Sequence, residues 1–174
     1  MESGNVSPQA AERVELRPVA PADDEFLLDV YASTRADEMA LVDWDDATKR
    51  AFLGSQFAAQ RADYESRFPD ADYHIIVVEG ERAGRLWVAR TPEQIRLLDI
   101  ALLPEFQNRG VGRFLLGGLI EESERTRLPL RHMVFQFNTA GMRFYERLGF
   151  KPSGEMGAYT QMERQPSTAA TQPS

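Results

Sequence analysis

The sequence contains no cysteine, so disulfide bonds, thiolate nucleophiles and zinc sites with cysteine ligands are all excluded. No apolar run reaches the ~20 residues that a membrane-spanning helix needs, so we expect no membrane partner. Residues 1–9 also lack the basic and apolar character of an export signal. These absences together lead us to expect a cytoplasmic protein.

Positive charge is scarce as well. Lysine and arginine number 20 against 27 aspartate and glutamate residues, which gives a net charge of -7 and a pI of about 4.9. With no basic cluster visible, this balance argues against a nucleic-acid partner. An acidic surface suits a cationic substrate such as an amine, but it also serves solubility alone, and composition does not separate the two.

The 174 residues fit a single domain, which would bury roughly two thirds of its unfolded surface. Residues 1–12 are polar and lack periodicity, and residues 165–174 have low complexity. We therefore expect a disordered tail at each end of one folded domain that spans residues 13–164.

Hydrophobic periodicity predicts an α+β domain built around one mixed sheet. In chain order the expected elements are a strand (14–17), a helix from residue 21, a helix (45–68), three antiparallel strands (73–79, 83–90 and 94–103), a helix (111–126), a strand (131–137), a helix (140–148) and a strand (159–163). Residues 33–44 and 151–154 are expected to be irregular. Strands that flank a helix pair in parallel through a right-handed crossover, so 94–103 and 131–137 should form a parallel pair.

Apolar residues at helical spacing mark the faces that three of these helices bury. The expected sets are Phe26, Leu27, Val30 and Tyr31; then Leu53, Phe57, Tyr64 and Phe68; then Phe114, Leu115, Leu119 and Ile120. His74 and His132 fall inside expected strands, and we interpret both as structural.

The most informative stretch runs from Ile95 to Glu122. A nearly unbroken apolar run ends at Pro104, and Gln107-Asn108-Arg109-Gly110-Val111-Gly112 then leads into a helix. A helix N-terminus presents unpaired N–H groups and the positive end of its dipole, which together attract anions. The missing Cβ atoms of Gly110 and Gly112 would let an anionic ligand approach the backbone. The stretch therefore predicts a phosphate-binding turn.

Neighbouring residues test two nucleotide interpretations of this turn. A P-loop continues as Gly-Lys-Ser/Thr, whereas Gly112 is followed by Arg113 and Phe114, so that interpretation fails. A dinucleotide fold needs a third glycine at the position of Leu115 and a strand–helix–strand unit before it, and this chain has neither.

A third interpretation comes from a resemblance in two separate motifs. Gln107-x-x-Gly110-x-Gly112 after a strand resembles the R/Q-x-x-G-x-G/A signature of the GNAT superfamily of acetyl-CoA-dependent N-acetyltransferases. Residues 138–150 are similar to that family's N-x-x-A-x-x-x-Y-x-x-x-G-F pattern, with Gly141 in place of the usual alanine. The resemblance covers roughly residues 14–163. It implies a GNAT fold, with a mixed, mostly antiparallel sheet of about six or seven strands, about four flanking helices, and a parallel strand pair that parts at the cofactor site.

The resemblance also implies acetyl-CoA as co-substrate and no metal ion. The pyrophosphate would lie on the amides from Asn108 to Arg113, and the pantetheine arm would pair with the backbone of Leu102 and Leu103. Asn138 would contact the cofactor, cap its helix, or do both. The Arg109 and Arg113 guanidiniums would meet phosphates or remain solvated. The implied cofactor-binding residues are Leu102, Leu103, Gln107, Asn108, Arg109, Gly110, Val111, Gly112, Arg113, Asn138 and Tyr145.

Candidate catalytic residues are fewer. Tyr145 matches the family tyrosine that faces the CoA sulfur, and a phenol of pKa ~10 is protonated at neutral pH and can donate to the departing thiolate. Its alternative role is core packing. Asp99, inside an apolar strand, is the candidate general base, or else it satisfies a neighbouring amide or arginine. Glu38 and Asp43 are the other candidates for the base. The acid that some family members carry five residues before the asparagine is replaced by Met133. The candidate acceptor contacts are Arg35, Glu38 and Trp44.

These observations predict an N-acetyltransferase that moves an acetyl group from acetyl-CoA to a small-molecule or peptide amine by direct attack in a ternary complex. The alternative is a catalytically silent acyl-CoA sensor or interaction module with the same fold. The family resemblance also suggests a homodimer. The sequence does not specify the acceptor.

Overall fold

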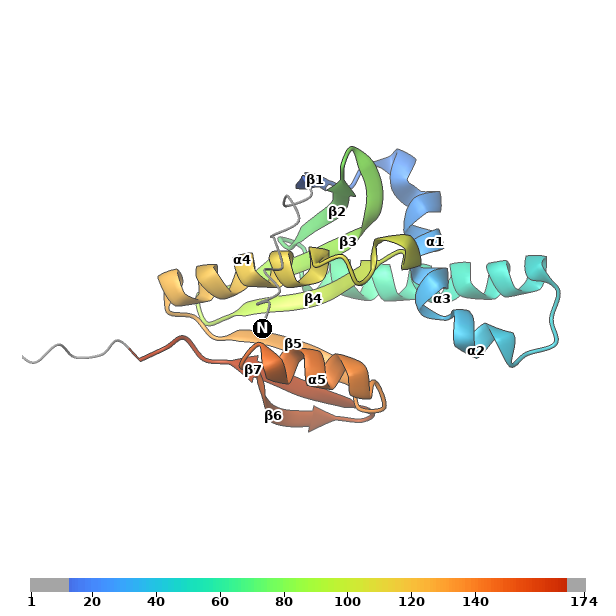
Figure 1. Ribbon diagram of the computed structural model, residues 1–174. Coiled ribbons are helices and arrows are strands. Elements are labelled where there is room, and N and C mark those ends of the chain that lie inside the picture. Colours follow the sequence, from blue (N-terminus) through green and yellow to red (C-terminus); the bar gives the residue numbers. More distant parts are fainter. Residues whose placement is uncertain (1–12, 169–174) are drawn as a thin grey trace, which may run out of the picture. The chain divides into compact units, whose positions relative to one another are not determined.

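The computed structural model describes residues 13–168, in which seven strands form one mixed sheet in the order β1-β2-β3-β4-β5-β7-β6 (Figure 1). The strands are β1 (Val14–Pro18), β2 (Asp72–Val78), β3 (Glu81–Arg90), β4 (Ile95–Leu102), β5 (Leu130–Phe135), β6 (Lys151–Met156) and β7 (Tyr159–Arg164). The helices are α1 (Asp24–Thr34), α2 (Ala36–Ala40), α3 (Asp46–Arg67), α4 (Val111–Thr126) and α5 (Thr139–Arg147), with short 3-10 turns η1 (Pro21–Asp23) and η2 (Pro104–Phe106). The predicted α+β class, the mixed sheet and the parallel β4–β5 pair are confirmed.

The chain divides into two compact units. The first holds the residues up to Asp63 together with 73–86 and 100–112, and the second holds 64–72, 87–99 and the residues from Arg113 onward. The expected tails at 1–12 and 169–174 lie outside the described residues, whereas Ser167, in the expected C-terminal tail, donates its N–H to Glu124.

In the first unit, helices α1 and α3 share an apolar core. All four residues predicted for the α1 face are buried, as are the first two of the α3 set: Phe26, Leu27, Val30, Tyr31, Leu53 and Phe57. The Tyr31 and Phe57 rings lie 5.5 Å apart, and the Asp24–Arg61 ion pair joins the two helices at 2.9 Å. Tyr64 and Phe68, the rest of the predicted α3 stripe, are only partly buried.

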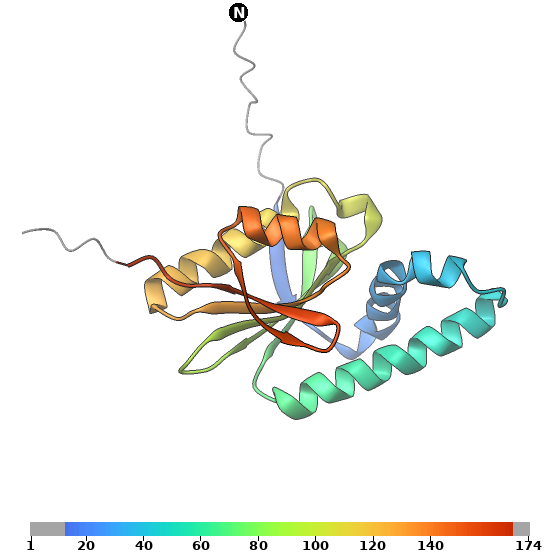
Figure 2. The same ribbon diagram turned by 90° about the horizontal axis from the view of Figure 1, so that it is seen from below.

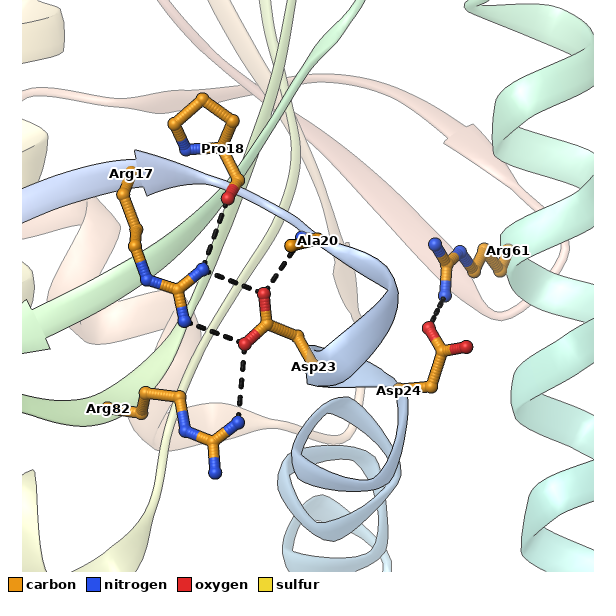
Figure 3. A network of polar contacts seen from close by, with 7 residues as sticks. All are labelled: Arg17, Pro18, Ala20, Asp23, Asp24, Arg61 and Arg82. Carbon is orange, nitrogen blue, oxygen red and sulfur yellow. Dashed lines mark hydrogen bonds and ion pairs between the residues drawn. The ribbon is translucent and has the colours of Figure 1, made fainter.

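A buried carboxylate fixes the start of α1 (Figure 3). Asp23 is 1% exposed and accepts two hydrogen bonds from Arg17, both at 2.7 Å, and one from Arg82 at 3.2 Å. It also accepts from the Ala20 N–H at 2.8 Å. These bonds hold the pKa of Asp23 far below its ordinary value, with the Arg17 hydrogen bond as the largest cause. The cluster ties β1, η1 and β3 together.

In the second unit, α4 and α5 cover one face of the β5–β7–β6 strands (Figures 1 and 2). Leu115, Leu116 and Leu119 of α4 are buried. The prediction that Phe114 joins this face is wrong, because its side chain is 59% exposed. At 100° per residue Phe114 shares its side of the helix with the exposed Gly118, whereas Leu116 lies about 60° from the buried Leu119 and takes the buried place.

Two predictions of irregular structure are also wrong. Residues 151–154 belong to β6, which pairs antiparallel with β7. Every β6 side chain is exposed, and Pro152 and a bulge interrupt its register, so this edge strand has no hydrophobic alternation to reveal it. Within the expected irregular segment 33–44, residues 36–40 form α2, which buries no side chain and therefore has no apolar stripe.

Across residues 13–168 no helix is both long and apolar enough to cross a membrane.

Candidate active site

The loop between β4 and α4 is held in shape by contacts among its own residues. Phe106 is buried, and the Arg109 guanidinium lies 5.2 Å from its ring centre and donates to the Glu105 carbonyl at 3.2 Å. The side-chain amide of Gln107 donates to the Leu102 carbonyl at 2.9 Å. The Gln107 N–H donates to the Pro104 carbonyl at 3.2 Å, and residues 107–110 remain exposed.

The backbone of this loop has the conformation of an anion site. Asn108 (φ 59°) and Gly110 (φ 81°) are left-handed, and α4 begins at the next residue, Val111. Left-handed residues in a turn gather backbone N–H groups into a concave nest, and the helix N-terminus adds its own N–H groups and dipole. A Cβ built on Gly112 would meet no atom within 4 Å, so folding alone does not require glycine there.

The end of β4 lies very close to β3. The Leu103 N–H donates to the Ala83 carbonyl at 2.9 Å, and the Leu103 carbonyl accepts from the Phe106 N–H at 2.9 Å. A Cβ on Gly84 would stand 2.0 Å from the Ala101 carbonyl oxygen, so only glycine fits. Sequence reasoning missed Gly84, although a lone glycine inside an apolar strand is the signal for such a close approach.

At the start of α5, Asn138 caps the helix. Its Oδ1 accepts from the Gly141 N–H at 3.0 Å. A Cβ on Gly141 would lie 2.4 Å from the Asn138 side-chain nitrogen. The glycine that departs from the family pattern therefore makes room for the cap.

Tyr145 of α5 is buried among aromatic rings. It is 6% exposed, and its ring lies 5.0 Å from that of His132 and 5.4 Å from those of Phe144 and Phe150. Burial, and secondly the negative charge of Asp99, raise the pKa of the Tyr145 phenol. The phenol therefore stays protonated throughout the neutral range and can act as a proton donor.

His132 of β5 was interpreted from sequence as structural only, yet it lies against Tyr145. Its Nδ1 is 2.9 Å from the Leu97 carbonyl oxygen. Burial lowers the pKa of His132, partly offset by the Leu97 hydrogen bond and the charge of Asp99, while the charge of Arg96 lowers it further. No motif signalled His132, because only the pairing of two distant strands brings it to this place.

The predicted acceptor residues lie between the end of α1 and the start of α3, with Glu38 in α2, and they contact neighbouring side chains. Arg35 and Glu38 form an ion pair at 3.2 Å, and the Arg35 guanidinium lies 5.3 Å from the Tyr31 ring centre. Trp44 is 43% exposed and meets the edge of Phe52 at 5.3 Å.

The structure thus collects the sequence-predicted residues in two groups, one in each unit. The first unit holds Leu102, Leu103 and residues 107–112, and the second holds Arg113, exposed on α4, and the cluster of Asp99, His132 and Tyr145. Within residues 13–168 no three histidine, aspartate or glutamate side chains gather as a metal site would require.

Known proteins share both the sequence pattern and the fold. Residues 69–152, which include both motifs, match the family model of the acetyltransferase (GNAT) domain. CgeE of Bacillus subtilis, an uncharacterized N-acetyltransferase, is 22% identical over 151 residues, covering 74% of this chain and 58% of its own length. The ribosomal protein bS18-alanine N-acetyltransferase of Salmonella typhimurium is 44% identical over 59 residues, covering 33% of this chain and 40% of that protein. The chain thus spans less than two thirds of either relative.

Solved structures agree over nearly the whole chain. The PaiA N-acetyltransferase from Thermoplasma acidophilum, in complex with coenzyme A, matches with a TM-score of 0.65 at 19% identity, covering 88% of this chain and 99% of its own. The ribosomal-protein-S18-alanine N-acetyltransferase from Escherichia coli matches with a TM-score of 0.60 at 18% identity, covering 93% and 99%. Residues 69–152 therefore match an acetyltransferase (GNAT) domain, and the chain shares its fold with solved N-acetyltransferases.

Proposed function

We propose that the protein transfers an acetyl group from acetyl-CoA to an amine by direct attack in a ternary complex. The observation that carries the proposal is the loop at residues 107–112, where left-handed Asn108 and Gly110 lead straight into the N-terminus of α4. That backbone suits a pyrophosphate, and the open space above Gly112 allows close approach. Acetyl-CoA supplies the activated acyl group as a thioester.

Each group of residues has a proposed part in holding this co-substrate. Val111 and Gly112, with the loop before them, offer N–H groups to the pyrophosphate, and the Arg113 guanidinium offers charge. The Leu102 carbonyl accepts the side-chain amide N–H of Gln107 in this structure. It is proposed to accept an amide N–H of the pantetheine arm in the complex. Arg109 stabilises the turn through Phe106 and Glu105, and its guanidinium is a further candidate for phosphate contact. Asn138, besides capping α5, is proposed to contact the cofactor.

Proton transfer needs one donor and one acceptor. We assign the donor role to the Tyr145 phenol, because its raised pKa keeps the proton available for the departing thiolate. Asp99 is proposed to take the proton of the attacking amine, directly or through water. Arg35, Glu38 and Trp44 are proposed to contact the acceptor, which is a primary amine of a small molecule or peptide.

The test is thiol release with acetyl-CoA over a panel of polyamines, amino acids, amino sugars and lysine peptides. On the best acceptor, Tyr145→Phe should lower kcat about ten-fold or more while leaving the acetyl-CoA Kd and the Tm unchanged. Tyr159→Phe, which removes a hydroxyl outside the motif, is the matched control and should retain full activity. A Tyr145→Phe enzyme as fast as the parent on a true substrate would remove Tyr145 from the mechanism.

The second candidate function is a catalytically silent acyl-CoA sensor. The protonated, buried Tyr145 favours the enzyme, because binding alone does not need a phenol at that position. Tight acetyl-CoA binding without turnover of any amine would favour the sensor, and no binding would reject both. A homodimer is likewise a proposal, and sedimentation equilibrium decides it.

A further inference from the structure

His132 occupies a special position in the sheet of the second unit. The parallel register of β4 and β5 runs from Ile95 opposite Leu130 to Leu97 opposite His132. The Ile95 N–H donates to the Pro129 carbonyl at 2.9 Å, so the odd-numbered residues of this part of β4 direct their backbone groups at β5. His132 therefore stands at the last residue pair of that register.

At this position a side chain, rather than a backbone N–H, donates the hydrogen bond that links β5 to β4. The Leu97 carbonyl, two residues after Ile95, also points toward β5. It receives the His132 imidazole, whose Nδ1 lies 2.9 Å from the oxygen. A carbonyl oxygen only accepts, so Nδ1 carries the hydrogen and, in the neutral ring, Nε2 carries the lone pair. The bond fixes both the tautomer and the plane of the ring.

The fixed imidazole packs against the ring of Tyr145. The two rings lie 5.0 Å apart with planes inclined by 56°. The charged groups that act on His132 are Asp99 and Arg96, both from β4, while α5 contributes the uncharged phenol. Burial lowers the pKa of His132, so at pH 7 the imidazole is neutral and adds no positive charge that would lower the pKa of the phenol.

We propose that His132 is a positioning residue for catalysis: locked to the Leu97 carbonyl through Nδ1–H, its ring holds the Tyr145 phenol in its donating orientation. The proposal rests on the acetyltransferase function proposed above, in which Tyr145 is the proton donor. It adds to that function that His132, fixed in the sheet, sets the orientation of the Tyr145 phenol. A purely structural His132 would support the fold without acting through Tyr145.

Two variants separate the two halves of the contact. His132→Phe keeps a ring but removes the donor to Leu97, and His132→Asn keeps an N–H donor close to the Nδ1 position but removes the ring. Each should lower kcat about ten-fold or more, because small displacements of an oriented group are costly. The acetyl-CoA Kd should stay within about two-fold for both. His74→Phe, which changes the other histidine of the chain, is the control and should retain full kcat.

The decisive measurement is a double-mutant cycle with Tyr145→Phe. If His132 acts through the Tyr145 hydroxyl, His132→Phe should cost nothing further in the Tyr145→Phe background. Losses that multiply, or an unchanged kcat in both single variants, would overturn the proposal. If His132→Phe does not fold, the same cycle is completed with His132→Asn.

The tautomer of the His132 imidazole can also be measured by NMR, independently of turnover. The ¹⁵N shifts of the two histidines, assigned with the His74→Phe variant, should show His132 as the Nδ1–H tautomer at neutral pH. An Nε2–H tautomer would overturn the proposal even in an active enzyme. A wild-type protein that turns over no amine but shows the Nδ1–H tautomer would instead refute the proposed acetyltransferase function and, with it, a catalytic use of the contact.

Discussion

At the scale of single residues, glycines that look equivalent in the sequence have different reasons to be glycine. Gly110 has a backbone φ of 81°, which disfavours any other residue in the turn itself. Gly112 has no such φ, and the space beside it is open. The fold therefore does not require glycine at position 112, whereas the proposed approach of acetyl-CoA to the backbone does.

This difference gives a prediction with a matched control. Gly112→Ala and Gly118→Ala both add a methyl group to α4 where no atom lies within 4 Å. Both should leave the unfolding free energy unchanged or raise it by up to about 1 kcal/mol, as alanine does in a helix. Only Gly112→Ala should weaken acetyl-CoA binding. Isothermal titration calorimetry should show its Kd raised by about ten-fold or more, which corresponds to a loss of at least about 1.4 kcal/mol. Equal affinities in the two variants would contradict a close approach at Gly112.

At the scale of elements, the first unit depends on one ionised carboxylate. Asp23 joins β1 through Arg17 and β3 through Arg82, and its bond to the Ala20 N–H closes η1. Because Asp23 is buried while both arginines remain partly exposed, removing the carboxylate leaves two guanidiniums that water can still reach. The cost is therefore at the lower end of that for a broken buried ion pair.

The predicted cost of Asp23→Asn is about 2 to 3 kcal/mol of unfolding free energy at pH 7. The folded-state pKa of Asp23 is depressed, so its stabilisation is present above the unfolded pKa of about 4 and is lost as the pH falls below it. Urea unfolding should therefore show the gap between parent and variant narrowing from pH 5 toward pH 2. Asp37→Asn, at an exposed position in α2, should change little at any pH. A gap that is constant with pH would mean that the charge of Asp23 contributes nothing.

At the scale of the whole molecule, a ligand that binds only the folded state raises the melting temperature by mass action. At a concentration of 100 times its Kd, acetyl-CoA should add about 2.7 kcal/mol. For a chain of this length that corresponds to a rise in Tm of about 5 to 10 °C. NAD at the same concentration should cause no shift, because the turn lacks the third glycine of a dinucleotide site. Equal shifts with both ligands would show a phosphate site without preference for coenzyme A.

Local chemistry accounts for what could be predicted from the sequence. The turn at 107–112 and the cap of α5 depend on residues at most a few positions apart, so their glycines and Asn138 reveal them directly. The helices α1, α3 and α4 each carry an apolar stripe at helical spacing, which predicted all three and gave the bounds of α3 and α4 to within about one residue. Strand β6 and helix α2 were not predicted, because neither buries a side chain and only burial produces a hydrophobic pattern in the sequence.

The sequence by itself determined the resemblance to the GNAT superfamily, the order of the main elements and the glycine pattern of the turn at 107–112. Only the tertiary structure decided the surroundings of Tyr145. His132 and Leu97 are 35 residues apart, and their hydrogen bond exists because the parallel register of β4 and β5 places them opposite one another. Burial, and secondly the charge of Asp99, raise the pKa of Tyr145 through the same folded arrangement. Register and long-range charge leave no local periodicity, which is why Tyr145 emerged from a motif and His132 only from the fold.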